Sequence, residues 1–134
     1  MGTGRYKTVK IMYFTSLEKQ AIYHFLVHMS LVDNDVDSKE VLLTVLICNK
    51  LNISESDRML SEKLSPNSAL EIISNMTSIE KDFVCSALGA MIAIDNNVNP
   101  KEMILWNLIS NRCGFPEMNV FQAQEKFQKY IENI

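Results

Sequence analysis

The residues best suited to chemistry in this sequence are carboxylates gathered into two short segments. The first segment holds Asp33, Asp35, Asp37 and Glu40 within eight residues. Carboxylate oxygens at such spacing are the ligands that Ca²⁺ and Mg²⁺ prefer. The segment begins like an EF-hand loop but is not one, because Ser38 stands where that loop requires glycine.

The second segment repeats the first with less charge. It keeps Asp95 and Glu102 but has Asn96, Asn97 and Asn99 at the intervening polar positions. A cation held by this segment alone would bind more weakly than one held by the first. The candidate metal ligands are therefore Asp33, Asp35, Asp37, Glu40, Asp95 and Glu102, with calcium or magnesium as the expected ion.

A purely structural interpretation covers part of this pattern. Asp37 with Glu40 has the spacing of a capping box at a helix start, and such a cap stabilises a helix by about 1 kcal/mol. Capping does not explain Asp33 and Asp95, which would follow the negative end of a helix at a cost of about 0.3 to 1 kcal/mol. Either a cation shared by the two segments or hydrogen bonds to the following backbone amides would hold these aspartates.

Other kinds of chemistry have little support. His24 and His28 have a spacing that zinc ligands use, but Phe25 follows His24, so the HExxH protease motif is absent, and we expect surface or satisfied core histidines. No phosphate-binding glycine loop or nucleophile motif is present, so we expect no enzymatic activity. The net charge of −3 and the pI near 5.4 argue against nucleic acid as a partner. The three cysteines, Cys48, Cys85 and Cys113, are far apart among apolar residues and are expected to be reduced core thiols.

An internal repeat organises the elements that carry the acidic segments. Residues 15–55 align without a gap on residues 77–117 at an offset of 62, and sixteen of the 41 positions are identical. Chance matching at ordinary amino-acid usage would give about two or three identities. The sequence therefore predicts two copies of one structural unit.

Each copy has the start signals of two helices. Thr15 with Glu18, and its counterpart Thr77 with Glu80, predict helices that begin near residues 16 and 78. Asp37 and Asn99 predict a second helix in each copy, with Pro100 at its first position in the second copy. Each repeat is therefore expected to be a helical hairpin with its acidic segment between the helices.

Apolar residues three and four apart predict which faces enter the core. The predicted stripes are Leu17, Ala21, Phe25, Met29 and Val32 in the first helix, and Val41, Val45, Cys48 and Leu51 in the second. The matching helices over residues 79–95 and 100–112 are more apolar, so both are expected at the centre of the domain.

The remaining chain completes an all-α domain. The insert over residues 56–76 predicts two short helices, with start signals at Ser54 and at Ser65 before a proline, and a last amphipathic helix opens near Asn119. The total is seven helices and no convincing strand, since only residues 9–14 have β character. We expect a compact single domain over residues 15–134, with repeats 15–55 and 77–117, a C-terminal helix over 118–134 and an N-terminal extension over 1–14.

With its repeated acidic pattern, the chain resembles the TerB-like family of tellurite-resistance and related bacterial proteins. The signature is an apolar helix that ends in Asp-Gly, an apolar residue two further on, and a Glu that opens the next helix. The matching positions are Asp33, Asn34, Val36 and Glu40, and then Asp95, Asn96, Val98 and Glu102. Asparagine replaces the usual glycine in both copies, and it also accepts a left-handed backbone.

The resemblance implies a seven-helix fold with internal pseudo-two-fold symmetry and no enzymatic activity. It also implies acidic residues suspected of binding metal and a link to stress responses. We therefore expect a module that binds a divalent cation or a protein partner through its acidic segments. The alternative is a purely structural interaction domain, for example a homo-oligomer, without metal.

The sequence also bears on location. Residues 1–14 lack the apolar core and cleavage site of a secretory signal, and the longest nearly uncharged apolar stretch, residues 83–94, is shorter than the ~20 residues of a bilayer span. We expect a cytoplasmic protein without direct membrane insertion.

Overall fold

Side-chain caps mark the starts of the helices at the positions that the sequence predicts. The structure is a computed structural model and describes residues 13–32, 37–94 and 96–133. The hydroxyls of Thr15 and Thr77 accept hydrogen bonds at 3.2 Å from the backbone amides of Glu18 and Glu80. In both cases the glutamate carboxylate accepts in return from the backbone amide of the threonine, which completes a capping box.

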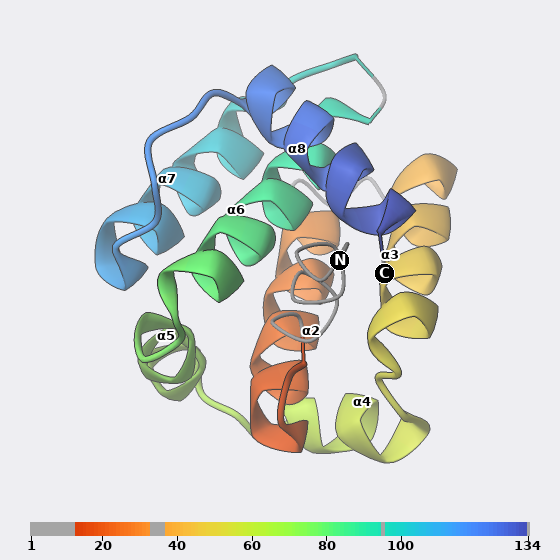
Figure 1. Ribbon diagram of the computed structural model, residues 1–134, viewed down its shortest axis with the longest axis vertical. Coiled ribbons are helices and arrows are strands. Elements are labelled where there is room, and N and C mark those ends of the chain that lie inside the picture. Colours follow the sequence, from red (N-terminus) through yellow and green to blue (C-terminus); the bar gives the residue numbers. More distant parts are fainter. Residues whose placement is uncertain (1–12, 33–36, 95, 134) are drawn as a thin grey trace, which may run out of the picture.

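The described residues form seven helices, as expected, and no strand. They are α2 (Ser16–Leu31), α3 (Ser38–Leu51), α4 (Glu55–Ser61), α5 (Pro66–Ser74), α6 (Ser78–Ala93), α7 (Pro100–Cys113) and α8 (Val120–Glu132). The predicted caps Asp37, Ser54, Ser65, Asn99 and Asn119 each precede a helix and accept a backbone hydrogen bond. This part of the chain is one compact all-α domain (Figure 1).

The longer helices lie next to one another in an order that differs from their order in the chain. Figure 1 shows α7, α6, α2 and α3 from left to right, with α5 and α4 below them and α8 across the upper part of α6. The closest packing joins α6 to α8, and α2 packs against α3, α4, α5 and α6. Both α2 and α6 run from the lower to the upper part of this view, so the C-terminal ends of these two helices lie at the same end of the domain.

The helix ends follow the same offset of 62 residues as the sequence identities. The bounds of α2 and α3 become those of α6 and α7 when 62 is added to each residue number. The residues that follow α3 and α7, Asn52 and Gly114, both have left-handed backbone, with φ of 55° and 70°. Asn96 has φ of 60°, as its place in the turn predicts, whereas Asn34 lies outside the described residues.

Helix α6 is the centre of the core, as expected. Every residue from 83 to 93 is buried, including Gly89. A methyl group added to Gly89 would lie 2.5 Å from Cβ of Ala123 on α8 and 3.0 Å from the Trp106 ring on α7. The glycine therefore lets three helices approach one another closely.

Two of the predicted core stripes are wrong in detail. In α3 the buried apolar residues are Leu43, Ile47, Cys48 and Leu51, while Val41 and Val45 face outward. In α2 the stripe is correct at Ala21, Phe25 and Met29, but Leu17 is exposed and Val32 is half-buried. Because α3 is apolar around most of its circumference, periodicity alone could not determine which side faces the core.

The prediction that α7 lies at the centre is also wrong. Only Glu102, Trp106, Ile109 and Cys113 of this helix are buried. Ile104 is 69% exposed. Helix α7 packs against α5 and α6 on one side and leaves the other side to solvent.

The three thiols are free and buried, as the sequence predicts. Cys48 lies on α3, Cys85 on α6 and Cys113 on α7. Of the helices that the structure describes, none combines the length and the apolar character that crossing a bilayer requires.

Candidate functional site

The acidic segments lie at the ends of helices, and the structure describes only part of each. Asp33, Asp35 and Asp95 lie outside the described residues. Asp37 caps α3, where its Oδ1 accepts from the backbone amide of Lys39 at 2.7 Å. Asp37 therefore has the structural role that its spacing predicts.

The two glutamates of the acidic segments are buried at matching positions. Glu40 and Glu102 are each 4% exposed and lie in the first turns of α3 and α7. Oε1 of Glu40 accepts from the backbone amide of Asp37 at 3.4 Å, which closes the predicted capping box. The positive end of a helix dipole favours a carboxylate in the first turn, so both positions suit a negative charge.

An apolar groove connects the start of α3 with the end of α6. It is lined by Lys39, Leu42, Leu43, Leu46 and Ile94 and has a volume of about 260 Å³. Ile94 is the residue directly before Asp95 in the sequence, and Lys39 is the second residue after Asp37. The groove therefore brings together the places where the two acidic segments join the helices.

A second contact joins the same two helices. The hydroxyl of Thr44 on α3 lies 3.8 Å from the sulfur of Met91, near the end of α6. This contact and the groove place the first half of α3 beside the last turn of α6.

The described residues do not contain a complete metal centre. No group of three or more His, Cys, Asp or Glu side chains outside the gaps at 1–12, 33–36, 95 and 134 is arranged to hold a metal ion. The three aspartates that would complete such a group all fall within those gaps. The cation hypothesis therefore stays a prediction.

The two histidines form a stacked pair on α2. Their ring centroids are 4.2 Å apart, and Nδ1 of the exposed His28 donates to the backbone carbonyl of His24 at 2.8 Å. His24 is 6% exposed, and within the described part of the chain Nε2 of His24 has no hydrogen-bond partner. His24 is thus a core histidine, but the expectation of a satisfied one is wrong for this atom.

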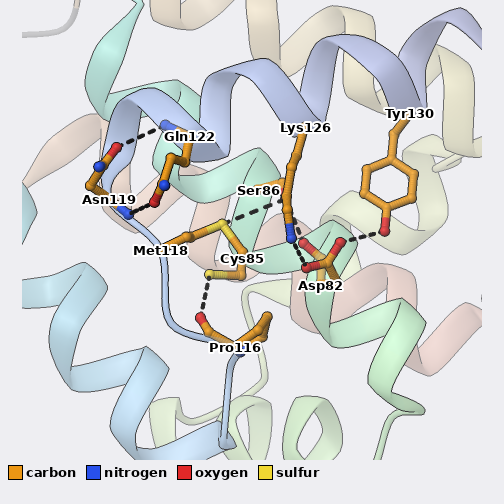
Figure 2. Close-up of polar contacts among 9 residues, drawn as sticks. All are labelled: Asp82, Cys85, Ser86, Pro116, Met118, Asn119, Gln122, Lys126 and Tyr130. Atoms are coloured by element: carbon orange, nitrogen blue, oxygen red, sulfur yellow. Dashed lines mark hydrogen bonds and ion pairs between the residues drawn. The ribbon is translucent and has the colours of Figure 1, made fainter.

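A polar cluster between α6 and α8 is not among the sequence predictions (Figure 2). The carboxylate of Asp82 on α6 accepts from Lys126 Nζ at 2.9 Å and from the hydroxyl of Tyr130 at 2.5 Å. Burial, and then the hydrogen bond to Asp82 and its charge, raise the pKa of Tyr130 well above its usual value. The hydroxyl is therefore a proton donor at neutral pH, and the cluster fixes α8 on α6.

The signal for this cluster in the sequence was weak. Lys126 and Tyr130 are four residues apart and so share one face of α8, but nothing in the sequence pairs that face with Asp82. The pairing of α8 with α6 is a tertiary contact between distant segments.

Comparison with known proteins finds a protein of similar fold but indicates no activity. Neither a family model nor a curated protein matches the sequence significantly. The structure is similar to the crystal structure of a protein of unknown function from Porphyromonas gingivalis W83, with a TM-score of 0.74 and 26% sequence identity. The similarity covers 87% of this chain and 91% of that chain, so it includes nearly all of the helical domain.

Proposed function

We propose that this chain is a non-catalytic, cytoplasmic TerB-like module that binds a divalent cation or a protein partner through its two acidic segments. In this proposal the segments are the turns of two helical hairpins related by pseudo-two-fold symmetry. Their shared offset of 62 residues, in both sequence and helix bounds, supports the symmetry.

The observation that carries the proposal is the groove between α3 and α6. Because Ile94 and Lys39 line one groove, the end of α6 and the start of α3, next to which the aspartates stand in the sequence, adjoin each other. One cation could then take oxygen ligands from both segments, which would explain why aspartates occur at the unfavourable ends of α2 and α6.

The chemistry of the described residues fits a hard cation. Glu40 and Glu102 provide carboxylates within two first turns, and the segments offer oxygen ligands rather than thiolates or imidazoles. Such donors favour Ca²⁺, Mg²⁺ or Mn²⁺ over the softer transition metals.

Thermal melts with added ions test the cation version. We expect Ca²⁺, Mg²⁺ or Mn²⁺ to raise Tm relative to chelator, because an ion at 100 times its Kd stabilises the folded state by about 2.7 kcal/mol. The double variant Asp33→Asn with Asp95→Asn should lose this shift.

A matched control comes from the repeat itself. Glu55 and Glu117 are also separated by 62 residues, and both side chains are exposed. The double variant Glu55→Gln with Glu117→Gln removes the same charge and should keep the shift. If no ion changes Tm, or if both double variants lose the shift equally, the cation version is wrong and only partner binding remains.

Exposed apolar side chains favour a second candidate, a purely structural interaction or homo-oligomerisation domain. Leu42 on α3 and Ile104 on α7 are each 69% exposed, and they occupy matching positions of the repeat. Sedimentation velocity measures the oligomeric state of the chain in solution and so tests this candidate directly. An oligomer that dissociates in Leu42→Glu or Ile104→Glu would support it, and a monomer at all concentrations would exclude homo-oligomerisation.

A further inference from the structure

The outward sides of α3 and α7 carry the same pattern of exposed side chains. In each helix a basic residue is second and thirteenth, an aliphatic residue is fifth and ninth, and an asparagine is twelfth. Because an α-helix has about 3.6 residues per turn, these five positions share about a third of the circumference. We refer to them as the α3 face and the α7 face. They are Lys39, Leu42, Leu46, Asn49 and Lys50 on α3, and Lys101, Ile104, Leu108, Asn111 and Arg112 on α7, all exposed.

Packing of the core does not account for this shared pattern. Seven positions are exposed in both helices, and three of them have the same residue in α3 and α7. The other seven positions of the two helices also have three identities. Exposed positions contribute little to stability and are therefore free to diverge between the copies of a repeat. A face that is kept as closely as the inward side indicates a role in binding.

The exposed charged side chains within both helices are all basic. The two acidic residues of these helices, Glu40 and Glu102, are each 4% exposed. The two basic residues of each face are 11 positions apart, about 16 Å along the helix axis. Each face is therefore an apolar centre between two positive ends, although the net charge of the chain is −3.

We propose that the α3 face and the α7 face each bind an acidic amphipathic helix of another protein. The partner helix places two aliphatic residues, four apart, against the apolar centre, and a carboxylate near each basic end. Helices that dock on apolar surfaces use anchors at this spacing, and unlike charges determine which surfaces pair. This inference rests on the second candidate function, an interaction domain, and does not involve the acidic segments.

The α3 face offers the larger apolar contact of the two. Leu42 and Leu46 also line the groove of about 260 Å³, which can receive a side chain of the partner. Val45, between them on α3, is 50% exposed, whereas the matching residue of α7 is Asn107. The α3 face should therefore bind the partner more tightly than the α7 face.

Charge disfavours a second copy of this chain as the occupant. Both ends of both faces are basic, so α3 or α7 pairing with either helix of another copy brings like charges together in either direction. Figure 1 places α7 and α3 at opposite edges of the row of long helices, so the two faces are separate sites. One chain can then hold two partner helices.

A synthetic peptide tests this inference on the full-length chain. The probe is a fluorescein-labelled, alanine-based helical peptide with two leucines four residues apart and a glutamate toward each end. A second peptide has lysine in place of both glutamates. By fluorescence anisotropy we expect the glutamate peptide to bind about ten times more tightly than the lysine peptide, with two glutamate peptides per chain.

Reversal of the charges on one face makes the test specific. Lys39→Glu with Lys50→Glu should leave one site for the glutamate peptide and create one for the lysine peptide, an exchange that a structural role would not produce. The matched control is Lys63→Glu with Lys129→Glu, because both lysines are exposed and lie outside the two faces. This control has the same change in charge and should keep both sites for the glutamate peptide.

Equal binding of the two peptides, binding of neither, or equal losses in the charge-reversed variant and its control would overturn the inference. One site per chain that disappears in the variant would support the α3 face and overturn the α7 face. Self-association that blocks the peptide and disappears in Leu42→Glu would overturn the inference but leave the second candidate function in place. Peptide binding together with unchanged melts in every cation would support the inference and reject the cation version of the proposed function.

Discussion

His24 is the residue whose surroundings most restrict its protonation. Its ring is buried on α2, stacked on His28 and edge-on to Phe25 at 4.9 Å. Burial lowers the pKa of His24 and the charge of His28 lowers it further, while a backbone group of Ser61 acts in the opposite direction. The folded protein therefore keeps this imidazole neutral at a pH where the unfolded chain is already taking up a proton.

This difference predicts a loss of stability in mild acid. The contribution of the neutral His24 ring to the free energy of unfolding is fully present above the unfolded-state pKa of about 6.5. It is lost as the pH falls through the lower pKa that His24 has in the folded state. One proton gives a slope of at most about 1.4 kcal/mol per pH unit. Urea unfolding between pH 8 and pH 5 should show this loss in the native sequence and a smaller one in His24→Leu.

A substitution of His28, the exposed neighbour of His24, provides a comparison for the loss of stability in acid. His28→Gln keeps the buried imidazole but removes a nearby positive charge, so the loss in acid should persist in weaker form. If His24→Leu loses as much stability as the native sequence over this range, then His24 is not the titrating group.

At the level of single residues the sequence was most informative about helix starts. Capping depends on residues three apart, so Thr15 with Glu18 and Asp37 with Glu40 could be recognised without any knowledge of the fold. The partners of Asp82 could not, because Lys126 and Tyr130 are more than forty residues away in the chain. Capping rules predict hydrogen bonds between residues that are close in the chain, whereas the cluster of Asp82, Lys126 and Tyr130 joins distant segments.

At the level of helices, packing rather than pattern decides which residues are buried. Helix α3 offers apolar residues on nearly every side, and its contact with α2 selects Leu43 and Ile47 over Val41 and Val45. Helix α7 is peripheral for the same kind of reason, since α8 rather than α7 makes the closest contact with α6. The number of helices followed from local signals, while their orientation required the tertiary structure.

Gly89 shows how closely two helices meet and gives a prediction at this level. An added methyl group would lie 2.5 Å from Cβ of Ala123, so Gly89→Ala should destabilise the fold by about 1 to 3 kcal/mol through overpacking. This outcome is opposite to the gain of up to about 1 kcal/mol that alanine normally gives inside a helix. Urea unfolding measures the difference.

A second substitution makes the interpretation specific. Gly89→Ala combined with Ala123→Gly restores the space between α6 and α8 and should recover part of the loss beyond what the two single changes predict by addition. A stability of Gly89→Ala equal to or above that of the native sequence would show that the helices separate without cost.

At the level of the whole molecule, the helices differ in how extensively they pack against their neighbours. Helix α6 contacts α2, α7 and α8, whereas α3 packs mainly against α2 and adjoins only the last part of α6. Local opening requires less free energy where fewer buried contacts break. The part of the domain that borders the proposed site is therefore the part expected to open first.

The labelling rates of the three buried thiols can report the order in which parts of the domain open. Burial, assisted by Asp82, raises the pKa of Cys85 to about 12, and burial raises that of Cys113 to about 11. Burial also raises the pKa of Cys48, although Arg58 opposes it. Because the thiolate is the reactive form, labelling at pH 8 should require opening, with Cys48 on α3 modified first.

Mass mapping of a thiol reagent over time, with and without denaturant, checks this order. Equal labelling rates would indicate that only complete unfolding exposes the thiols. Modification of Cys85 before Cys48 would contradict the uneven packing of α3 and α6.

The single tryptophan gives the protein an optical reporter of its own. Trp106 is buried on α7, its Nε1 donates to the carbonyl of Cys85 on α6 at 3.2 Å, and its ring lies near Gly89 of α6, where Ala123 of α8 also approaches. Emission from this one indole should shift to longer wavelength when any of these three helices separates. Folding and ligand experiments on the unlabelled chain can therefore be followed by fluorescence, with no background from a second indole.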